Sequence, residues 1–166
     1  MINNYRIGNG FDVHALVKGR ELILGGAKID YHLGLEGHSD GDALIHSIID
    51  SLLGPTDIGD IGQLFPDTNP LYKNVNSIDL LKDVFRRITS LGFSVINIDS
   101  VIICEQPKIF PYISEMKKNI SNATGGILPP KSIGIKGKTS EGLGFTGRGE
   151  GIAVYTVSLL YFNFSE

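Results

Sequence analysis

The chain has 166 residues, with 15 basic and 18 acidic side chains and a formal net charge of −3. This balance excludes the basic surface of a typical nucleic-acid-binding protein, and a single cysteine excludes a disulfide within the chain. A chain of this length can bury its own core, so we expect one domain over residues 1–166. The N-terminus shows no secretory pattern and no apolar run approaches about 18 residues, so we expect a cytoplasmic protein.

The predicted elements mix strands and helices, separated by glycine and proline. Residues 5–14 and 21–24 are expected to be strands that form a hairpin. Ser39 is expected to cap a helix that continues through residues 43–53. Further helices are predicted over residues 78–91 and 111–123, and further strands over residues 95–104, 132–136 and 152–162. We therefore expect an α/β fold of the α+β sandwich type, a mixed β-sheet covered by helices on one face.

All four histidines lie between residues 14 and 46, and three side chains there have the makings of a metal site. Asp12 and His14 share one face of a strand, and His46 lies on the first predicted helix. Two imidazoles and a carboxylate suit zinc, iron or manganese and leave a coordination position open. Asp42 or Asp50 could accept the second ring proton of His46, and we favour Asp42. The alternative is that all three are ordinary polar residues.

Residues 136–151 form a glycine-rich second motif. Its Gly-Lys-Thr-Ser run resembles part of a phosphate-binding P-loop, but Ser132 stands where that pattern requires glycine, so the P-loop is excluded. Glycines still let backbone N–H groups approach an anion, and Lys138, Thr139 and Arg148 supply further donors. The alternative is a glycine-rich hairpin between two strands.

Two loops could contact a ligand. Residues 59–69 are too polar for a helix or strand, and could cover a ligand and hold hydroxyl groups through Asp60, or serve only as a connector. Backbone groups near Pro107 are not all committed to a β-ladder and could contact a planar base. By composition alone, Cys104 is expected to be a small apolar strand residue.

Five motifs in order together resemble the family of the 2-C-methyl-D-erythritol 2,4-cyclodiphosphate synthases. They are residues 10–14, 38–46, 59–68, 107–108 and 141–153. The resemblance spans nearly the whole chain. It implies a phosphorus–oxygen lyase of non-mevalonate isoprenoid (terpenoid) biosynthesis that converts 4-diphosphocytidyl-2-C-methyl-D-erythritol 2-phosphate to 2-C-methyl-D-erythritol 2,4-cyclodiphosphate and releases CMP. The substrate's own 2-phosphate is then the nucleophile, so the enzyme must position it and neutralise charge.

The resemblance also implies roles for individual residues. It places one zinc ion per subunit on Asp12, His14 and His46, and a magnesium or manganese ion between the substrate phosphates. His38 and Thr139 would stabilise the transition state. The residues implied to bind substrate are Asp12, Val13, His14, His38, Ser39, Asp60, Ile61, Gly62, Phe65, Pro66, Asp67, Thr68, Asn69, Cys104, Glu105, Gln106, Pro107, Lys108, Ile109, Phe110, Lys138, Thr139, Ser140, Glu141, Phe145 and Arg148.

The same resemblance implies a homotrimer that packs through its sheets, with active sites between subunits and no nucleic-acid or membrane partner. Phe145 and Arg148 resemble residues near a trimer axis, where the family can enclose an apolar cavity for isoprenoid diphosphates. Lys138, Asn69 and Cys104 depart from the commonest family residues, and Lys138 adds charge near the expected phosphates. Two other functions stay open: a metal-dependent phosphohydrolase with water as nucleophile, and a nucleotide-binding module with a structural metal.

Overall fold

The computed structural model describes residues 4–66, 68–72 and 75–163, and its centre is a mixed five-stranded sheet. The strands are β1 (Tyr5–Val17), β4 (Gly34–Leu35), β5 (Phe93–Ile103), β6 (Ile133–Lys138) and β7 (Gly151–Phe162). They lie in the order β4-β1-β7-β5-β6, where β5 and β6 are parallel and the other neighbours antiparallel. A separate small hairpin pairs β2 (Leu22–Leu24) with β3 (Ala27–Ile29).

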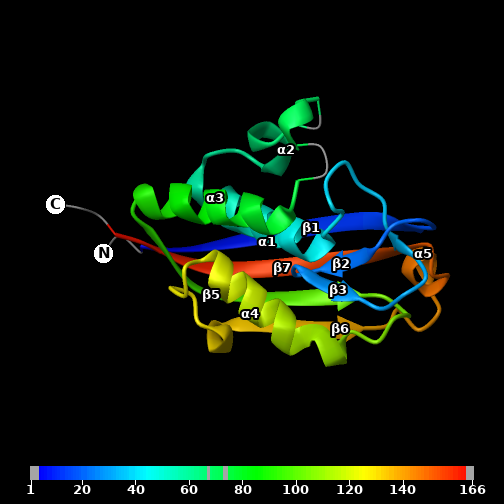
Figure 1. Cartoon of the computed structure of the whole chain (residues 1–166). Helices are drawn as coiled ribbons and strands as arrows, with labels where there is room; N and C mark the ends of the chain where they lie inside the picture. The colour runs from blue at the N-terminus through cyan, green and yellow to red at the C-terminus, as the bar shows by residue number, and fades with distance from the viewer. Residues whose placement is uncertain (1–3, 67, 73–74, 164–166) are drawn as a thin grey trace.

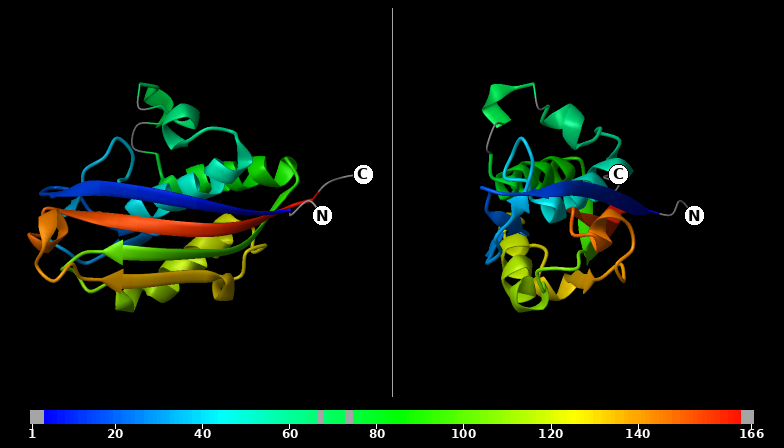
Figure 2. Two further views of the ribbon diagram at one scale, coloured as in Figure 1. Left: turned by 180° about the vertical axis from the view of Figure 1, so that it is seen from behind. Right: turned by 90° about the vertical axis from the view of Figure 1, so that its right-hand side faces the viewer.

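The long helices α1 (Ala43–Leu53), α3 (Ser77–Ser90) and α4 (Ile113–Ala123) all lie on one face of this sheet (Figure 1). Seen from behind, the opposite face carries no helix (Figure 2, left). Shorter elements are α2 (Ile61–Leu64), α5 (Gly144–Gly147) and the 3-10 turns Gly54–Thr56, Pro70–Tyr72, Phe110–Tyr112 and Pro130–Ser132. The expected mixed sheet with helices on one face is confirmed. None of the helices in the described residues is long and apolar enough to cross a membrane.

Two glycines of β1 let α1 lie directly against the strand. A Cβ atom on Gly10 would come within 1.9 Å of the carbonyl oxygen of Ser47, and one on Gly8 within 1.8 Å of that of Ser51. Any side chain at either position would therefore push the helix away from the strand. This close approach is what brings His46 of α1 over the strand residues that follow Gly10.

The core forms where α1 is enclosed between the sheet and the other helices. Its apolar side chains are fully buried, namely Ala43, Leu44, Ile45, Ile48, Ile49, Leu52 and Leu53. Each large side chain among them contributes on the order of 1.5–3 kcal/mol through removal from water. In contrast, α3 is amphipathic and buries only one side, including Leu81, Val84 and Ile88. The element that carries His46 is therefore rigidly held.

The expected hairpin between residues 5–14 and 21–24 is wrong. β1 pairs with β7 along most of its length and with β4 at its end, while β2 pairs with β3. Gly25 and Gly26 both have positive φ and form the tight turn between β2 and β3. Neighbouring strands in the sequence were expected to pair, but the long partner of β1 comes from the other end of the chain.

Three smaller expectations also need correction. Asp42, not Ser39, caps α1, because its side chain accepts the hydrogen bond from Ile45 N. Residues 59–69 are not wholly irregular, since they include α2. The alternative of a hairpin across residues 136–151 is wrong: β5 lies between β6 and β7 in the sheet.

Candidate active site

Three metal-binding side chains meet where α1 packs on β1. Asp12 Oδ2 lies 2.8 Å from His14 Nε2 and 3.1 Å from His46 Nδ1, and these two ring nitrogens are 3.2 Å apart. Ligand atoms around a tetrahedral zinc ion, with bonds of about 2.0–2.1 Å, are separated by about 3.3–3.4 Å. The three atoms therefore already have nearly the spacing that one ion requires. The predicted meeting of these side chains is confirmed.

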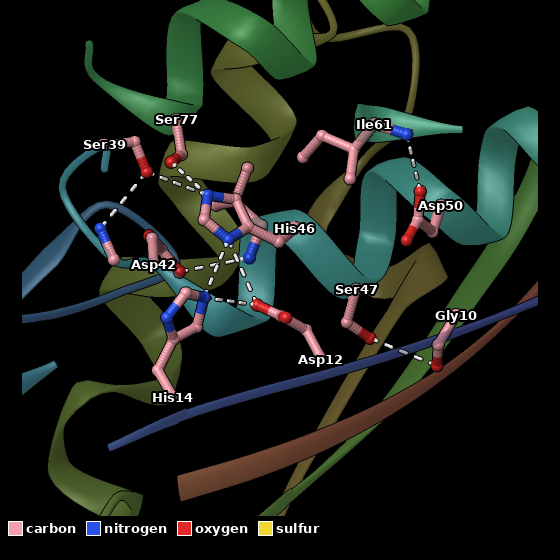
Figure 3. A network of polar contacts seen from close by, with 12 residues as sticks. Gly10, Asp12, His14, Ser39, Asp42, His46, Ser47, Asp50, Ile61 and Ser77 are labelled. Atoms are coloured by element: carbon pink, nitrogen blue, oxygen red, sulfur yellow. Dashed lines mark hydrogen bonds and ion pairs between the residues drawn. The ribbon is translucent and has the colours of Figure 1, made fainter. Parts of the chain in front are cut away.

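Each histidine of this triad makes a second contact on its far side. His14 Nδ1 hydrogen-bonds the carbonyl oxygen of Glu36, which leaves its Nε2 toward the triad. His46 Nε2 lies 2.9 Å from Ser77 Oγ and 3.1 Å from Ser39 Oγ, and Figure 3 shows both hydroxyls on the side of the ring away from Asp12. Both nitrogens that face the triad are thus available as ligands.

The expected support of His46 by Asp42 is wrong. The Asp42 carboxylate is fully buried and accepts hydrogen bonds from the backbone N–H groups of Gly25, Gly26 and Ile45. The Asp50 carboxylate likewise accepts from Ile61 N, at 2.9 Å. Spacing along the helix predicts that both carboxylates lie near His46, but both accept hydrogen bonds from backbone N–H groups instead.

Charge in the triad is matched to a cation. Burial raises the pKa of Asp12, but hydrogen bonds from His14 and His46 outweigh this and lower that pKa to about 2. Burial lowers the pKa of His14, while the hydrogen bond and charge of Asp12 raise it, and the net direction is upward. Asp12 is therefore an anionic ligand across the physiological range.

A cavity of about 190 Å³ opens beside the triad. It is lined by Asp12, His14, His38, Ser39, His46, Ile61, Gly62, Phe65, Tyr72, Val75 and Leu80. The buried Nε2 atom of His38 has no hydrogen-bond partner among the described residues. Buried polar atoms in proteins are usually hydrogen-bonded, so this unpartnered nitrogen beside the cavity is unusual. Sequence reasoning missed Tyr72, Val75 and Leu80, because only the fold brings α3 and the preceding turn to this wall.

A second cavity of about 490 Å³ lies at the ends of β5 and β6. It is lined by Cys104, Pro107, Lys108, Ile109, Phe110, Ile113, Ile135, Lys136, Gly137, Lys138 and Thr139. Its lining combines apolar side chains with lysines, which suits a ligand that joins a planar base to phosphate groups. Burial raises the pKa of Cys104 to about 11, so its thiol stays protonated and acts as apolar lining.

Glu105 anchors the loop that follows β6. Its carboxylate accepts hydrogen bonds from Ser140 N at 3.0 Å, Ser140 Oγ at 3.2 Å and Gly142 N at 3.2 Å. The backbone N–H of Gly142, followed by those of Ser140, lowers the pKa of Glu105. Because Thr139 is adjacent to this anchor, Glu105 fixes the position of a residue predicted to be catalytic.

Some predicted substrate residues lie outside both cavities. Asp60 caps α2, where its carboxylate accepts from Gln63 N. Val13 is on the sheet face opposite the triad and is 43% exposed. Arg148 forms an ion pair with Glu150. The remaining predicted residues outside both linings are Pro66, Thr68, Asn69, Glu105, Gln106, Ser140, Glu141 and Phe145. Asp67 lies outside the described residues.

Within the part of the chain that the structure describes, the two cavities share no lining residue. A family model, described as the YgbB family, matches residues 5–161. The chain belongs to the YgbB family.

Similar proteins of known name agree with membership in the YgbB family. The chain is 53% identical over 155 residues to the 2-C-methyl-D-erythritol 2,4-cyclodiphosphate synthase of Clostridium acetobutylicum, covering 93% of this chain and 99% of that protein. The bifunctional IspDF of Campylobacter jejuni matches with a TM-score of 0.91 and 42% identity over 96% of this chain and 42% of its own. A CDP-bound 2C-methyl-D-erythritol-2,4-cyclodiphosphate synthase matches with a TM-score of 0.84 and 36% identity, covering 93% and 99% of the two chains. The expected family is confirmed, and with it the expectation of an enzyme.

Proposed function

We propose that this chain is a 2-C-methyl-D-erythritol 2,4-cyclodiphosphate synthase. It converts 4-diphosphocytidyl-2-C-methyl-D-erythritol 2-phosphate to the cyclic diphosphate and releases CMP. The observation that carries the proposal is the cluster of Asp12, His14 and His46, with their ligand atoms about 3 Å apart, beside a cavity. It occurs in a chain 53% identical to a named synthase.

Zinc is the metal that best fits the triad. Two imidazole nitrogens and one carboxylate oxygen at near-tetrahedral spacing leave a fourth position open, which is the arrangement of catalytic rather than structural zinc. Bound zinc would supply Lewis-acid polarisation of a phosphoryl oxygen. A magnesium or manganese ion between the substrate phosphates completes the proposed cofactors, because the crowded phosphate charges need more neutralisation than one zinc ion gives.

The proposed reaction needs no nucleophile from the protein. An oxygen of the substrate's 2-phosphate bonds to the β-phosphorus, and the bond from that phosphorus to the oxygen bridging the α-phosphate breaks. CMP leaves with that oxygen and its electron pair. The class is therefore a phosphorus–oxygen lyase, whose protein contributes position and charge.

The residues of the chain have separate tasks in this reaction. His38 and Ser39 line the triad cavity, where we assign both to the phosphates. Gly62 and Ile61 present the wall where the erythritol part binds. Thr139 and Lys138 approach the diphosphate from the second cavity, whose lining between Cys104 and Phe110 holds the cytosine. The other predicted substrate residues in the described part of the chain lie outside these two linings, and their contacts with the ligand stay predictions.

A homotrimer accounts for the separation of the two cavities. In a trimer the triad of one subunit and the base-binding cavity of its neighbour can form one site. The uncovered face of the sheet supports this assembly, since it exposes Ile7 at 75%, Tyr155 at 53%, Val157 at 50% and Phe11 at 45%. Monomers seldom leave such a contiguous apolar surface in water. A single domain over residues 1–166 and a cytoplasmic location complete the proposal.

The test is to incubate zinc-quantified protein with 4-diphosphocytidyl-2-C-methyl-D-erythritol 2-phosphate and magnesium, and to follow phosphorus NMR. We expect CMP and a cyclic diphosphate in equal amounts. A linear product that carries oxygen from labelled water would instead identify a metal-dependent phosphohydrolase. Zinc-loaded protein that binds CDP without turnover would identify a nucleotide-binding module.

A further inference from the structure

The outer nitrogen of His46 is connected to a carboxylate through one hydroxyl group. His46 Nε2 lies 2.9 Å from Ser77 Oγ, and Ser77 Oγ donates to Asp40 Oδ1. Asp40 Oδ2 also accepts from Ser77 N, at 2.9 Å. Ser77 is fully buried at the first residue of α3, so its hydroxyl has little freedom to turn elsewhere.

The direction of the hydrogen bond from Ser77 favours an N–H at His46 Nε2, and Ser39 Oγ, 3.1 Å from the same nitrogen, can accept from that N–H as well. An ionised carboxylate can only accept, so the Ser77 hydroxyl must use its proton toward Asp40. Toward His46 the Ser77 hydroxyl can then only accept a hydrogen bond, and the donor would be an N–H at Nε2. With a metal on the triad, the lone pair of Nδ1, the nitrogen that lies 3.1 Å from Asp12 Oδ2, would face the ion, and Nε2 would carry the N–H that the Ser77 hydroxyl accepts.

We propose that Asp40 and Ser77 are positioning residues that hold His46 in the tautomer and orientation required for metal binding. The inference rests on the proposed function, since it assumes that the triad holds zinc. Histidine ligands commonly donate their other N–H to a carboxylate or carbonyl group. Here the hydroxyl of Ser77 lies between His46 and the carboxylate of Asp40 and connects them by hydrogen bonds.

The same contacts join the metal site to the cavity wall. Asp40 N also donates to the carbonyl oxygen of Val75, at 3.3 Å, so Asp40 holds both the start of α3 and the turn before it. Val75 lines the triad cavity, as does Leu80 further along α3. The orientation of His46 and the placement of this wall therefore both depend on Asp40, through its carboxylate at Ser77 and through its backbone N–H at Val75.

The sharpest variant is Asp40→Asn. The side-chain amide can place an N–H where an acceptor stood, and the Ser77 hydroxyl then turns to accept from it and donates to His46 Nε2. This favours the tautomer with the proton on Nδ1, where the metal should bind. We expect zinc affinity, measured by competition with a chelating dye, to fall about 10–100-fold.

A second pair of variants keeps the test decisive if Asp40→Asn folds poorly. Ser77→Ala removes the hydroxyl and should lower zinc affinity about tenfold, whereas Ser77→Thr keeps it and should restore most of that loss. Asp79→Asn is the matched control, because Asp79 is an exposed carboxylate in the same first turn of α3. It should leave zinc affinity unchanged.

The outcomes separate this inference from the proposed function. Wild-type zinc affinity in both Asp40→Asn and Ser77→Ala, with the folded state verified by circular dichroism, would overturn the positioning role. A wild-type protein that binds no zinc would instead overturn the metal site on which the proposed function depends. Equal losses in Ser77→Ala and Ser77→Thr would also count against the inference, because the hydroxyl would then not be the group that matters.

Discussion

One oxygen of Asp12 contacts both histidines of the triad, so this carboxylate is the centre of the proposed metal site. Its pKa of about 2 shows that the folded protein favours the anion even without a metal. Removal of this charge or of an imidazole should weaken metal binding, and turnover should fall as a consequence.

We predict that Asp12→Asn and His46→Ala each lose zinc and reduce turnover more than about 100-fold. Each change removes one of three protein ligands, and the two that remain cannot enclose an ion. Zinc content by atomic absorption and CMP release are the measurements. His32→Ala is the matched control, because His32 is exposed and its ring makes an edge contact with Tyr31, away from the triad. Full zinc occupancy with normal turnover in Asp12→Asn would refute the ligand assignment.

Lys138 should affect substrate binding more than chemistry. It is exposed and lines the second cavity, where the proposed function would place its ammonium group near the substrate diphosphate. We predict that Lys138→Ala raises KM about tenfold and changes kcat less than about threefold. Steady-state kinetics measure both constants, with Lys118→Ala on exposed α4 surface as the control. A fall in kcat at unchanged KM would assign Lys138 to the transition state instead.

Function also depends on how the loops and helix ends are anchored. Glu105 holds the loop after β6 through three hydrogen bonds, and Thr139 is next to that loop. We predict that Glu105→Ala lowers kcat about tenfold by loosening Thr139, while Glu105→Gln, which keeps one acceptor oxygen, loses less. Zinc content should not change in either variant. Kinetics with Glu115→Ala as the control measure the effect, and an unchanged kcat in Glu105→Ala would show that the loop needs no anchor.

The buried Asp42 should give the stability of α1 a recognisable pH dependence. Burial raises the pKa of Asp42 to about 6, so the folded protein binds a proton here that the unfolded chain, with an ordinary Asp pKa near 3.8, releases. Between those two values stability rises as pH falls. From pH 7 to pH 5 the metal-free wild type should therefore gain about 1 kcal/mol of unfolding free energy relative to Asp42→Asn. Urea denaturation at both pH values measures this, and an opposite or absent trend would contradict the raised pKa.

The sequence predicts the helices of this fold better than the pairing of its strands. The helices over residues 43–53 and 78–91 were predicted within about one residue because their apolar spacing agrees with the glycine, Gly54 or Gly92, that follows each of them. The pairing of β1 with β7 was not predicted, because strand alternation says which face is buried but not which distant strand is the partner. Ser77 was missed for the same reason. Its role arises from a contact with Asp40, 37 positions away, that local pattern cannot indicate.

For the whole molecule, the two faces of the sheet divide the proposed work. The face under α1 holds Asp12 and His14, while the opposite face is uncovered and exposes apolar side chains, with Phe11 against Tyr155 at a ring-centroid distance of 4.6 Å. Alternation along β1 therefore places metal ligands and assembly residues side by side in the sequence but on opposite sides of the molecule. Metal binding and assembly can consequently be separated by mutation.

Ile7→Glu should separate them. Ile7 is 75% exposed on the uncovered face, so a charge there leaves the monomer able to fold but must be desolvated when subunits pack together. We predict a shift from trimer to monomer in sedimentation velocity, loss of most turnover, and zinc affinity within about twofold of wild type, because all three ligands come from one chain. Ile127→Glu, at an exposed isoleucine that follows α4, should remain trimeric and active. An active Ile7→Glu monomer would show that one subunit holds a complete site and that the two cavities need no neighbour.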